Sequence, residues 1–415
     1  MKIAIVGSGI AGLTCAYLLN RQHDIQVFEA SDWIGGHTHT VDVEVQGRSY
    51  AIDTGFIVFN DWTYPNFIRL LEQLGVGFKP TEMSFSVSDP VSGVEYNGHD
   101  LNTLFAQRSN LLSPAFWGML REILRFNRQA LDDLANNRIS ADTTLGQYLD
   151  SNGYGRRFIE HYIVPMGSAI WSMSLADMLG FPLQFFVRFC KNHGLLSVSD
   201  RPTWQVIEGG SRSYVAPLTE SFAERIRLNC PVSRVVRDQD GVTLHSAAGA
   251  ERFDKVIFAC HSDQALALLD QASEKESEIL GALPYANNDV VLHTDTRLLP
   301  KRKLAWASWN YRLGGPREQM AAVTYDMNIL QGIDSATTFC VSLNQTAAID
   351  PSKILARFQY AHPQYSLAGT AAQARWEELL GAQHTYYCGA YWANGFHEDG
   401  VVSALRVARA FGETL

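Results

Sequence analysis

The sequence has little charge, and its cysteines follow no pattern. Charged residues make up 19% of the 415 positions and 46% are hydrophobic, a balance that excludes an intrinsically disordered chain. Acidic residues outnumber basic ones by 43 to 34, so we expect no nucleic-acid partner. The closest two cysteines, Cys230 and Cys260, are 30 positions apart. This scatter excludes a disulfide scaffold and Cys-x-x-Cys sites, and it predicts buried thiols in a reducing compartment.

Long hydrophobic runs are missing too. No stretch reaches the roughly 18 uninterrupted apolar residues of a membrane-spanning helix. The uncharged segment Ile3–Leu19 comes nearest, but glycines crowd it and a β-branched run precedes them, which is not the composition of a secretory signal. We therefore expect a cytoplasmic protein. Repeats and Pro/Ser-rich linkers are also absent, which predicts domains woven from separated segments.

What the sequence does have is a βαβ pattern at its start. Lys2–Val6 is a short apolar run, typical of a buried strand in a parallel sheet. The small and apolar residues of Gly9–Asn20 predict a helix packed closely on that sheet, and Ile25–Glu29 predicts a second strand. The fold therefore begins as a Rossmann-like α/β layer.

The rest of the chain alternates in character. The amphipathic, aromatic segment Phe116–Phe126 predicts a helix within a mainly helical insertion. Helical spacing is also found over Pro351–Tyr360, and Val401–Phe411 predicts a closing helix. Strand patterns occur at Arg234–Val236, Val256–Ala259 and Asp289–His293.

The turn after the first strand matches a phosphate-binding motif. Its residues are Gly7-Ser8-Gly9-Ile10-Ala11-Gly12. In this G-x-G-x-x-G pattern Gly7 permits a tight turn, Gly9 lets a diphosphate approach the backbone, and Gly12 lets helix and strand pack closely. Glu29, at the end of the second strand, can accept hydrogen bonds from a ribose and disfavours the 2′-phosphate of NADP. The alternative is an ordinary strand-to-helix turn with a solvated Glu29.

The residues that follow favour FAD over NAD. Glu29–Thr38, with its Gly35-Gly36 pair, resembles flavoproteins of the flavin amine oxidase, phytoene desaturase and protoporphyrinogen oxidase superfamily. In that family the pair passes close to the FAD diphosphate, and the element that Asp53–Phe56 resembles runs beside the flavin ring. The resemblance implies non-covalent FAD. A thioether from Cys388 is the alternative, but the family's covalent cysteine sits in a different local pattern.

The resemblance continues along the chain. Ile207–Ser211 is similar to the segment that returns to the FAD domain, Cys230–Val232 to the strand that contacts adenine, and Val256–Cys260 to an apolar strand of that domain. Tyr387–Ala390 and Gly395–Val401 resemble the second FAD-binding motif. The cofactor-binding residues that the resemblance implies are Gly7, Ser8, Gly9, Ile10, Ala11, Gly12, Glu29, Ala30, Ser31, Gly35, Gly36, His37, Thr38, Gly55, Phe56, Val232, Gly389, Gly400 and Val401.

Three positions depart from the family pattern. His37 stands where arginine is common, so its phosphate contact should depend on protonation. Ala390 stands where an acidic residue is usual. Asn287–Asp289 lies near the place where many amine oxidases have a lysine, so amine oxidation with oxygen is implied less strongly than FAD binding.

A flavin carries the redox chemistry itself, so the protein has to hold the substrate and exclude water. No catalytic side chain can be assigned from the sequence. The candidates for lining the flavin are Phe56, Tyr391, Trp392 and His397, and Phe56 is the strongest of them. Tyr391 and Trp392 could equally be core packing residues. The apolar segments Phe116–Phe126 and Phe181–Phe189 predict either an apolar tunnel or helix cores. A tunnel would imply a lipid-like or polyene substrate and a peripheral membrane contact.

Other chemistries have less support. His37-x-His39 has no third ligand nearby, so we expect no metal, and the Gly-x-Ser-x-Gly motif of a nucleophile elbow is absent. We predict an FAD-dependent oxidoreductase that moves a hydride from a C–H or C–N group of a small or lipophilic substrate to flavin N5, with an unknown acceptor. The alternatives are a flavin-dependent isomerase or mutase without net redox, and a non-catalytic dinucleotide-binding protein.

The predicted fold class is α/β, α+β overall, with a Rossmann-like FAD-binding domain interwoven with a mixed helical and sheet substrate domain. We assign residues 1–75, 200–285 and 381–415 to the FAD-binding domain. Residues 76–199 and 286–380 form the predicted substrate domain, with the helical insertion at about 100–195.

Overall fold

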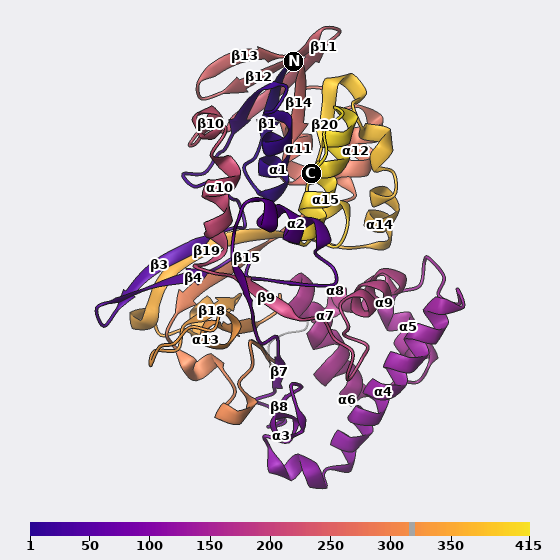
Figure 1. Ribbon diagram of the computed structural model, residues 1–415. Helices are drawn as coiled ribbons and strands as arrows, with labels where there is room; N and C mark the ends of the chain where they lie inside the picture. Colours follow the sequence, from indigo (N-terminus) through magenta and orange to yellow (C-terminus); the bar gives the residue numbers. More distant parts are fainter. Residues whose placement is uncertain (315–319) are drawn as a thin grey trace.

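The structure is a computed structural model that describes residues 1–314 and 320–415. Both chain ends lie in its upper part, which is built around a parallel sheet, and a second sheet and a group of helices lie below (Figure 1). In those two ranges no helix is both long and apolar enough to cross a bilayer.

The upper part contains the βαβ unit predicted from the sequence. Its strands run parallel in the order β10-β2-β1-β14-β20, which brings distant segments of the chain side by side. Because both faces of the sheet are covered, its central strands read as continuous apolar runs. The strands are β1 (Lys2–Val6), β2 (Asp24–Phe28), β10 (Ile226–Arg227), β14 (Lys255–Phe258) and β20 (Thr385–Tyr387).

Alternate side chains of β1 enter two different cores. Ile3 and Ile5 pack with α1 (Ile10–Leu19) and α15 (His397–Ala410), which lie against each other on one face. Ala4 and Val6 pack on the other face with a three-stranded antiparallel sheet and two helices. These elements are β11 (Val232–Asp238), β12 (Gly241–Ser246), β13 (Gly249–Phe253), α11 (Ser262–Leu268) and α12 (Glu274–Gly281).

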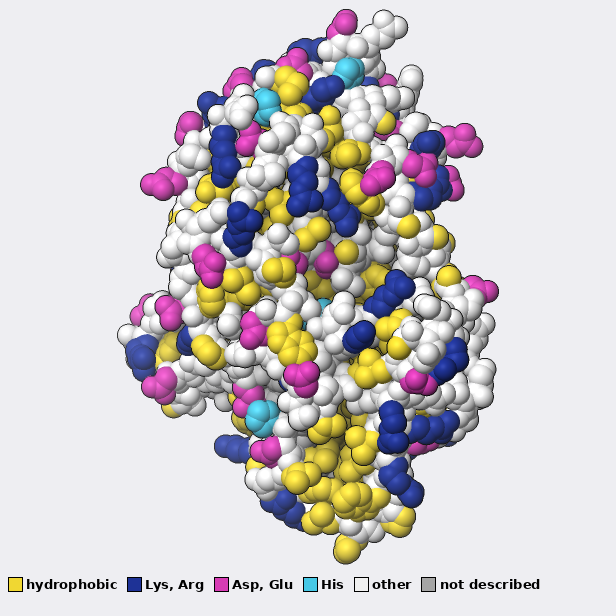
Figure 2. All heavy atoms as spheres, turned by 45° about the vertical axis from the view of Figure 1, so that its right-hand side comes forward, with side chains coloured by type: hydrophobic (Ala, Val, Ile, Leu, Met, Phe, Trp, Pro, Cys, Tyr) yellow, Lys and Arg dark blue, Asp and Glu magenta, His cyan; other side chains and the backbone are white. Residues whose placement is uncertain are grey.

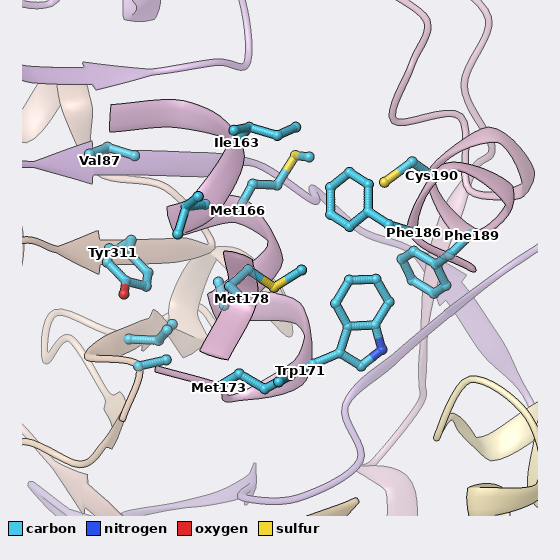
Figure 3. Close-up of a cluster of buried hydrophobic side chains, with 14 of the residues drawn as sticks. Val87, Ile163, Met166, Trp171, Met173, Met178, Phe186, Phe189, Cys190 and Tyr311 are labelled. Atoms are coloured by element: carbon cyan, nitrogen blue, oxygen red, sulfur yellow. The ribbon is translucent and has the colours of Figure 1, made fainter. Parts of the chain in front are cut away.

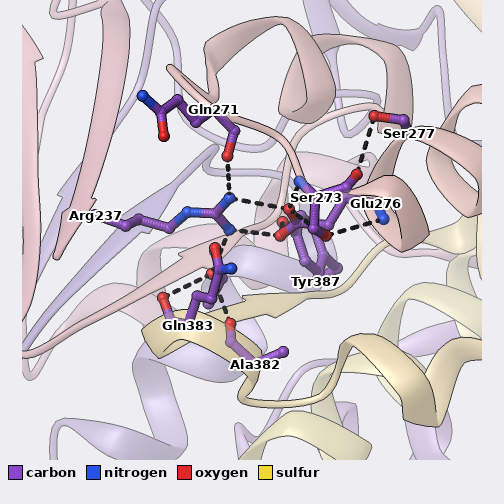
Figure 4. A network of polar contacts seen from close by, with 9 residues as sticks. Arg237, Gln271, Ser273, Glu276, Ser277, Ala382, Gln383 and Tyr387 are labelled. Carbon is purple, nitrogen blue, oxygen red and sulfur yellow. Dashed lines mark hydrogen bonds and ion pairs between the residues drawn. The ribbon is translucent and has the colours of Figure 1, made fainter. Parts of the chain in front are cut away.

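A buried ion pair holds this second face together (Figure 4). The Arg237 guanidinium of β11 donates to both carboxylate oxygens of Glu276 on α12, and the Tyr387 hydroxyl of β20 donates to the same carboxylate at 2.6 Å. The side chains of Arg237 and Glu276 are only 6% and 3% exposed. Burial by itself raises the pKa of Glu276, but the hydrogen bonds from Arg237 and Tyr387 outweigh it and lower the pKa to about 2.

The lower sheet has seven strands in the order β19-β15-β18-β17-β16-β7-β8. One sequence prediction is wrong here: Pro351–Tyr360 does not form a helix. A 3-10 turn over Pro351–Lys353 leads into β19, which pairs antiparallel with β15 along its whole length. The strands are β7 (Phe85–Ser88), β8 (Glu95–Asn97), β15 (Tyr285–His293), β16 (Trp309–Arg312), β17 (Val323–Asp326), β18 (Cys340–Leu343) and β19 (Ile354–Pro363).

The reason lies in the period of the pattern. Ile354, Ala356 and Phe358 point inward at every second position, whereas Leu355 and Arg357 between them are exposed. This spacing of two is the pattern of a half-buried strand. The long partner β15 supplies the hydrogen bonds that local sequence cannot reveal.

Two smaller sheets and a helix connect the upper and lower parts. The hairpin of β3 (Thr40–Val45) and β4 (Arg48–Asp53) follows the first βαβ unit. Strand β9 then pairs with two strands that precede it by more than a hundred positions. These elements are β5 (Val58–Asn60), β6 (Phe78–Pro80), β9 (Trp204–Ile207) and α2 (Pro65–Gln73).

The predicted helical insertion packs on the lower sheet. Met166 and Trp171 of α7 face Phe186 and Phe189 of α9, and Tyr311 of β16 lies on the opposite side of α7 (Figure 3). The amphipathic segment 116–126 lies within α4, as predicted. The helices of the insertion are α3 (Leu101–Leu104), α4 (Pro114–Ala135), α5 (Leu145–Ser151), α6 (Arg156–Phe158), α7 (Val164–Trp171), α8 (Leu175–Leu179) and α9 (Leu183–Asn192). Shorter helices elsewhere are α10 (Val215–Thr219), α13 (Met327–Leu330) and α14 (Leu367–Gln373).

Candidate cofactor and substrate site

The glycines of the first turn have different steric surroundings. A Cβ on Gly12 would lie 2.1 Å from the carbonyl oxygen of Gly7, and a Cβ on Gly7, whose φ is +107°, would lie 2.8 Å from the carbonyl oxygen of Ala259. The chain's own backbone therefore demands both of these glycines. A Cβ on Gly9, in contrast, would meet no heavy atom within 4 Å. Open space thus lies beside the first residues of α1, where free backbone amides favour an anion.

Glu29 fixes the shape of this turn. Its Oε2 accepts hydrogen bonds from the amide of Ser8 at 2.8 Å and from the Ser8 hydroxyl at 2.6 Å, while Oε1 accepts from the amide of Ser31 at 2.9 Å. A carboxylate offers about four acceptor positions, so these bonds leave capacity for a ribose hydroxyl. The sequence indicated the ribose contact but not the bonds to Ser8.

The Gly35-Gly36 pair lies directly against the turn. The amide of Gly35 donates to the carbonyl of Ser8 at 3.0 Å, and a Cβ on Gly36 would approach the Cα of Gly9 to 3.1 Å. Both glycines have positive φ. On the far side of β2, the amide of Cys230 donates to the carbonyl of Glu29, which places Val232 next to the same strand end. Ala30 lies between Glu29, whose carbonyl accepts from Cys230, and Ser31, whose amide donates to the Glu29 carboxylate. The segments predicted to hold the diphosphate and the adenine are thus neighbours of one turn.

Three half-buried histidines meet beside the Gly-Gly pair. The His37 ring lies 5.5 Å from the His362 ring and 6.3 Å from the His261 ring, centroid to centroid. Burial, helped by the neighbouring imidazoles, lowers the pKa of His37 and of His261 to about 4 and that of His362 to about 3. His37 Nε2 has no hydrogen-bond partner among the described residues. The cluster is therefore neutral and retains unused hydrogen-bonding capacity.

Sequence reasoning missed His261 and His362. They come from separate segments, the first following β14 and the second near the end of β19, so only the folded chain brings them to His37. Asn288 of β15, which is fully buried, bonds His362 Nδ1 through its Nδ2 at 3.3 Å and accepts from Asn344 at 2.8 Å. The segment without the family's lysine thus adjoins the histidine cluster.

Phe56 and His397, two of the candidate flavin neighbours, stack on each other. Their ring centroids are 3.5 Å apart and the planes differ by 9°. His397 Nε2 bonds the Tyr214 hydroxyl at 2.9 Å and the Thr38 hydroxyl at 3.1 Å. A Cβ on Gly55 would lie only 2.2 Å from a backbone oxygen of the Gly35–Thr38 loop. Burial drives the pKa of His397 well below its ordinary value, so the stacked ring is a neutral imidazole.

The other two candidates, Tyr391 and Trp392, lie elsewhere. Both are buried in the core on the β11 side of the parallel sheet. The Tyr391 hydroxyl and Trp392 Nε1 have no hydrogen-bond partner within the described ranges. The structure therefore brings together one pair of the predicted candidates but not all four.

Residues of the second motif pack α15 closely against α1. A Cβ on Gly400 would lie 2.7 Å from Cγ2 of Ile10, and the side chain of Val401 is fully buried in the same core. Gly389 donates its amide to the Ser403 hydroxyl at 2.9 Å. Ala11 lies in α1 beside Gly400. The two glycine motifs thus adjoin across the helix pair.

Cys388 adjoins Gly389, and its side chain packs in the core beside α1 and α15. Its Sγ is fully buried and lies 3.8 Å from the Sγ of Cys15. All six cysteines are free and only Cys260 is not fully buried, which confirms the prediction of buried thiols. This packing leaves Cys388 unsuited to a flavin thioether.

Aromatic side chains from the helical insertion form a wall against the second motif. We define this aromatic wall as Trp171, Phe185, Phe189, Tyr365 and Phe396. Phe189 stacks on Phe396 with centroids 5.2 Å apart, and Trp171 Nε1 donates to the carbonyl of Asn394 at 3.3 Å. Phe185 lies 5.1 Å from Tyr365. Buried aromatic side chains of the lower part therefore pack against the segment predicted to bind the flavin.

Substitution of Glu29 tests the ribose contact. We expect Glu29→Ala to weaken FAD binding by about 1–3 kcal/mol, because charge-assisted hydrogen bonds to the cofactor and to the turn are lost. The Kd of the apoprotein for FAD, measured by quenching of flavin fluorescence, should rise about fivefold to 150-fold. The exposed Glu224, changed to Ala, is the matched control. Equal Kd values for both variants would contradict a role of Glu29 in cofactor binding.

His37 is expected to give FAD binding a pH dependence. A diphosphate beside His37 would raise the pKa of this side chain above its value of about 4. The protonated imidazole then contributes its full binding free energy below a pH of about 4. This contribution is lost as the pH rises through the higher pKa of the complex. We expect the Kd for FAD to increase with pH. The groups that face His37 are His261, His362, His397 and Tyr360.

A permanent charge at this position should reduce the pH dependence. His37→Arg should tighten FAD binding above neutral pH by about tenfold and flatten the plot of log Kd against pH, because a guanidinium stays protonated. Titration calorimetry at several pH values measures both effects. The exposed His99, changed to Arg, controls for added charge, and a slope equal to that of wild type would show that His37 does not contact the phosphates.

Comparisons with known proteins identify a family for this chain. The family model described as flavin containing amine oxidoreductase matches residues 10–328. The 1-hydroxycarotenoid 3,4-desaturase of Flavobacterium sp. (strain P99-3) is 29% identical over 153 residues, which are 36% of this chain and 29% of that enzyme. The match thus spans less than a third of the length of that relative.

Two solved structures share the fold over nearly the whole chain. The cyclohexylamine oxidase from Brevibacterium oxydans IH-35A has a TM-score of 0.68, and the CLA-producing fatty acid isomerase from P. acnes has 0.72. Each is 16% identical, with 99% of this chain and 98% of the other covered. At such identity the likeness concerns the fold alone, and it confirms the predicted fold class.

Proposed function

We propose, since this chain belongs to the family of flavin containing amine oxidoreductases, that it oxidises a C–H group of an apolar, lipid-like substrate. Family membership makes it an FAD-dependent oxidoreductase. The observation that carries the choice of substrate is the aromatic wall, whose uncharged side chains pack beside the second motif. The match to a carotenoid desaturase supports the same choice.

The residues present fit a bound FAD. Gly9 leaves open space at the start of α1, and His37 Nε2 is an unused polar atom beside it. The amides of the Gly7–Gly12 turn would hold the diphosphate, and Glu29 would hold the ribose. Bound FAD supplies a two-electron acceptor at its N5.

The chain's own residues would then orient the substrate and keep water out. Trp171, Phe189 and Phe396 make the surroundings of the second motif apolar and uncharged, which favours a hydrocarbon over an ammonium group. Asn288 carries an amide in the segment where many relatives of this family have a lysine, and an amide neither titrates nor acts as a base. The hydrogen bonds of His397 Nε2 with the Tyr214 and Thr38 hydroxyls fix the His397 ring on which Phe56 stacks.

Anaerobic reduction of the flavin tests this proposal. The holoenzyme would be mixed without oxygen with oleate, with phytoene, or with the amines cyclohexylamine and putrescine, and flavin absorbance followed. We expect bleaching with an apolar compound and none with the amines. Bleaching by the amines alone, with release of ammonia, would contradict the proposal. So would an altered apolar product formed without bleaching, which would indicate an isomerase.

A further inference from the structure

One end of the helical insertion carries an unusual set of exposed apolar side chains. We call this end the tip; it consists of α3, the 3-10 turn Arg108–Leu112, the first half of α4 and the 3-10 turn Lys303–Ala305. Six of the eleven exposed large hydrophobic side chains in the described ranges belong to it. They are Leu101 (76% exposed), Leu111 (47%), Leu112 (88%), Trp117 (45%), Leu124 (49%) and Leu304 (39%).

The tip projects from the molecule as a continuous apolar surface. Figure 2 shows the yellow side chains gathered at the lower end, where the protein narrows. The largest apolar patches of soluble monomers usually mark interaction sites. A projecting surface suits insertion into a soft phase, whereas a groove would suit a peptide or a helix.

The hydrophobic core beneath the tip is already filled, so the exposed side chains have no room to turn inward. Phe105 and Phe116 fill the space below, with ring centroids 5.7 Å apart. Trp117 Nε1 donates to the carbonyl of Leu111 at 2.9 Å, which fixes the 3-10 turn to α4. The side chain of Ser113 caps α4. The exposed leucines therefore stand on an ordered scaffold.

Basic side chains surround the apolar surface. They are Arg108, Arg121, Lys301, Arg302 and Lys303, all exposed. Dark blue side chains flank the yellow tip in Figure 2. This excess of positive charge stands out on a chain whose formal net charge is −9.

The acidic side chains of this region are engaged in structural contacts. Glu95 is buried and pairs with Arg302 at 2.8 Å, so the positive charge of the rim rests mainly on Arg108, Arg121, Lys301 and Lys303. Asp100 caps α3. Glu122 accepts a hydrogen bond from the amide of Gly155 at 2.7 Å. The tip thus combines protruding Leu and Trp side chains with a basic rim, the composition of a surface that binds anionic lipid.

We propose that the tip docks this protein on an anionic lipid bilayer, with its leucines and Trp117 among the acyl chains and its basic rim at the headgroups. In a symmetric dimer joined tip to tip the two basic rims would face and repel each other, so the charge of the rim favours an anionic bilayer over a second copy of this chain at the same surface. Docking is independent of the reaction proposed above, so the failure of one proposal leaves the other standing.

Sedimentation with vesicles tests the docking. The holoenzyme would be mixed with vesicles of phosphatidylcholine alone or with added phosphatidylglycerol. We expect it to bind the anionic vesicles about tenfold more strongly than the neutral ones, and added salt to weaken that binding. No binding to anionic vesicles would overturn the proposal.

Paired variants distinguish membrane binding by the tip from nonspecific adsorption of exposed apolar side chains. Leu111→Ser with Leu112→Ser should reduce binding to anionic vesicles about tenfold, because two inserted side chains are lost. Val198→Ser with Leu355→Ser, two exposed side chains outside the tip, is the matched control and should bind like wild type. Lys301→Glu with Lys303→Glu should remove the preference for phosphatidylglycerol. Thermal melting checks that each variant is folded.

Two results would overturn the proposal. One is equal vesicle binding by the tip variant and the control variant. The other is a dimer, measured by light scattering, that dissociates in Leu111→Ser with Leu112→Ser, because the surface would then be an interface between two copies of this chain.

Discussion

Gly9→Val is expected to give a folded protein that does not retain FAD. The backbone of Gly9 is extended, with φ −69° and ψ 175°, a conformation that valine adopts without strain. The added side chain would meet no protein atom near its Cβ, so the fold should tolerate it. It would instead fill the space beside the amides of α1 that the diphosphate requires. The ratio of flavin to protein absorbance after purification should fall to the background level.

Two other glycines make this test specific. Gly118 of α4 also has open space around its added Cβ, so Gly118→Val should keep both fold and cofactor. Gly12→Ala should destabilise the protein itself, because the new Cβ would lie 2.1 Å from the carbonyl oxygen of Gly7. Retention of FAD by Gly9→Val at the wild-type level would show that the cofactor does not occupy this space.

Glu276→Gln should destabilise the upper part of the molecule by about 3–5 kcal/mol. The substitution removes the negative charge from a buried pair and leaves the Arg237 guanidinium, 6% exposed, without its counter-charge. It also weakens the hydrogen bond from Tyr387, which joins α12 to β20. Urea unfolding of the apoprotein, followed by circular dichroism, measures the loss of unfolding free energy.

The pH dependence of unfolding gives a second readout for Glu276. Its pKa is lowered in the folded state to about 2, from an ordinary value of 4.5. The ionised group therefore contributes its full stabilisation above about 4.5, and that contribution is lost as the pH falls toward 2. Wild type should lose stability over this range more steeply than Glu276→Gln.

A surface pair provides the control for this prediction. Asp238 and Arg252 also form an ion pair, but their side chains are 53% and 43% exposed. Asp238→Asn should leave the unfolding midpoint unchanged, because exposed pairs are screened by water and salt. Equal unfolding midpoints for Glu276→Gln and Asp238→Asn would contradict the role assigned to the buried pair.

The start of the fold could be predicted from the sequence because its determinants are local. The apolar run of β1, the small residues of α1 and the glycine turn between them are consecutive in the chain, and each has a steric cause that the structure shows. The open space at Gly9 and the crowding at Gly12 match the roles that the G-x-G-x-x-G pattern predicts.

Other features depend on partners that are distant in the chain. β19 has a period of two, yet only its pairing with β15 distinguishes it from a helix. His261 and His362 reach His37 through the ends of two strands from different sheets. The exposure of Leu111 and Leu112 is equally hidden in the sequence, because periodicity does not reveal which apolar residues stay uncovered.

The chromophore of the purified protein tests the central claim most directly. The claim is that the turn at Gly9, with Glu29 and the Gly-Gly pair beside it, holds a dinucleotide that carries a flavin. Heat denaturation followed by chromatography of the supernatant should recover intact FAD in a one-to-one ratio with the chain, and the denatured polypeptide should be colourless. A purified protein that is colourless before denaturation, or one that releases NAD instead, would contradict the account.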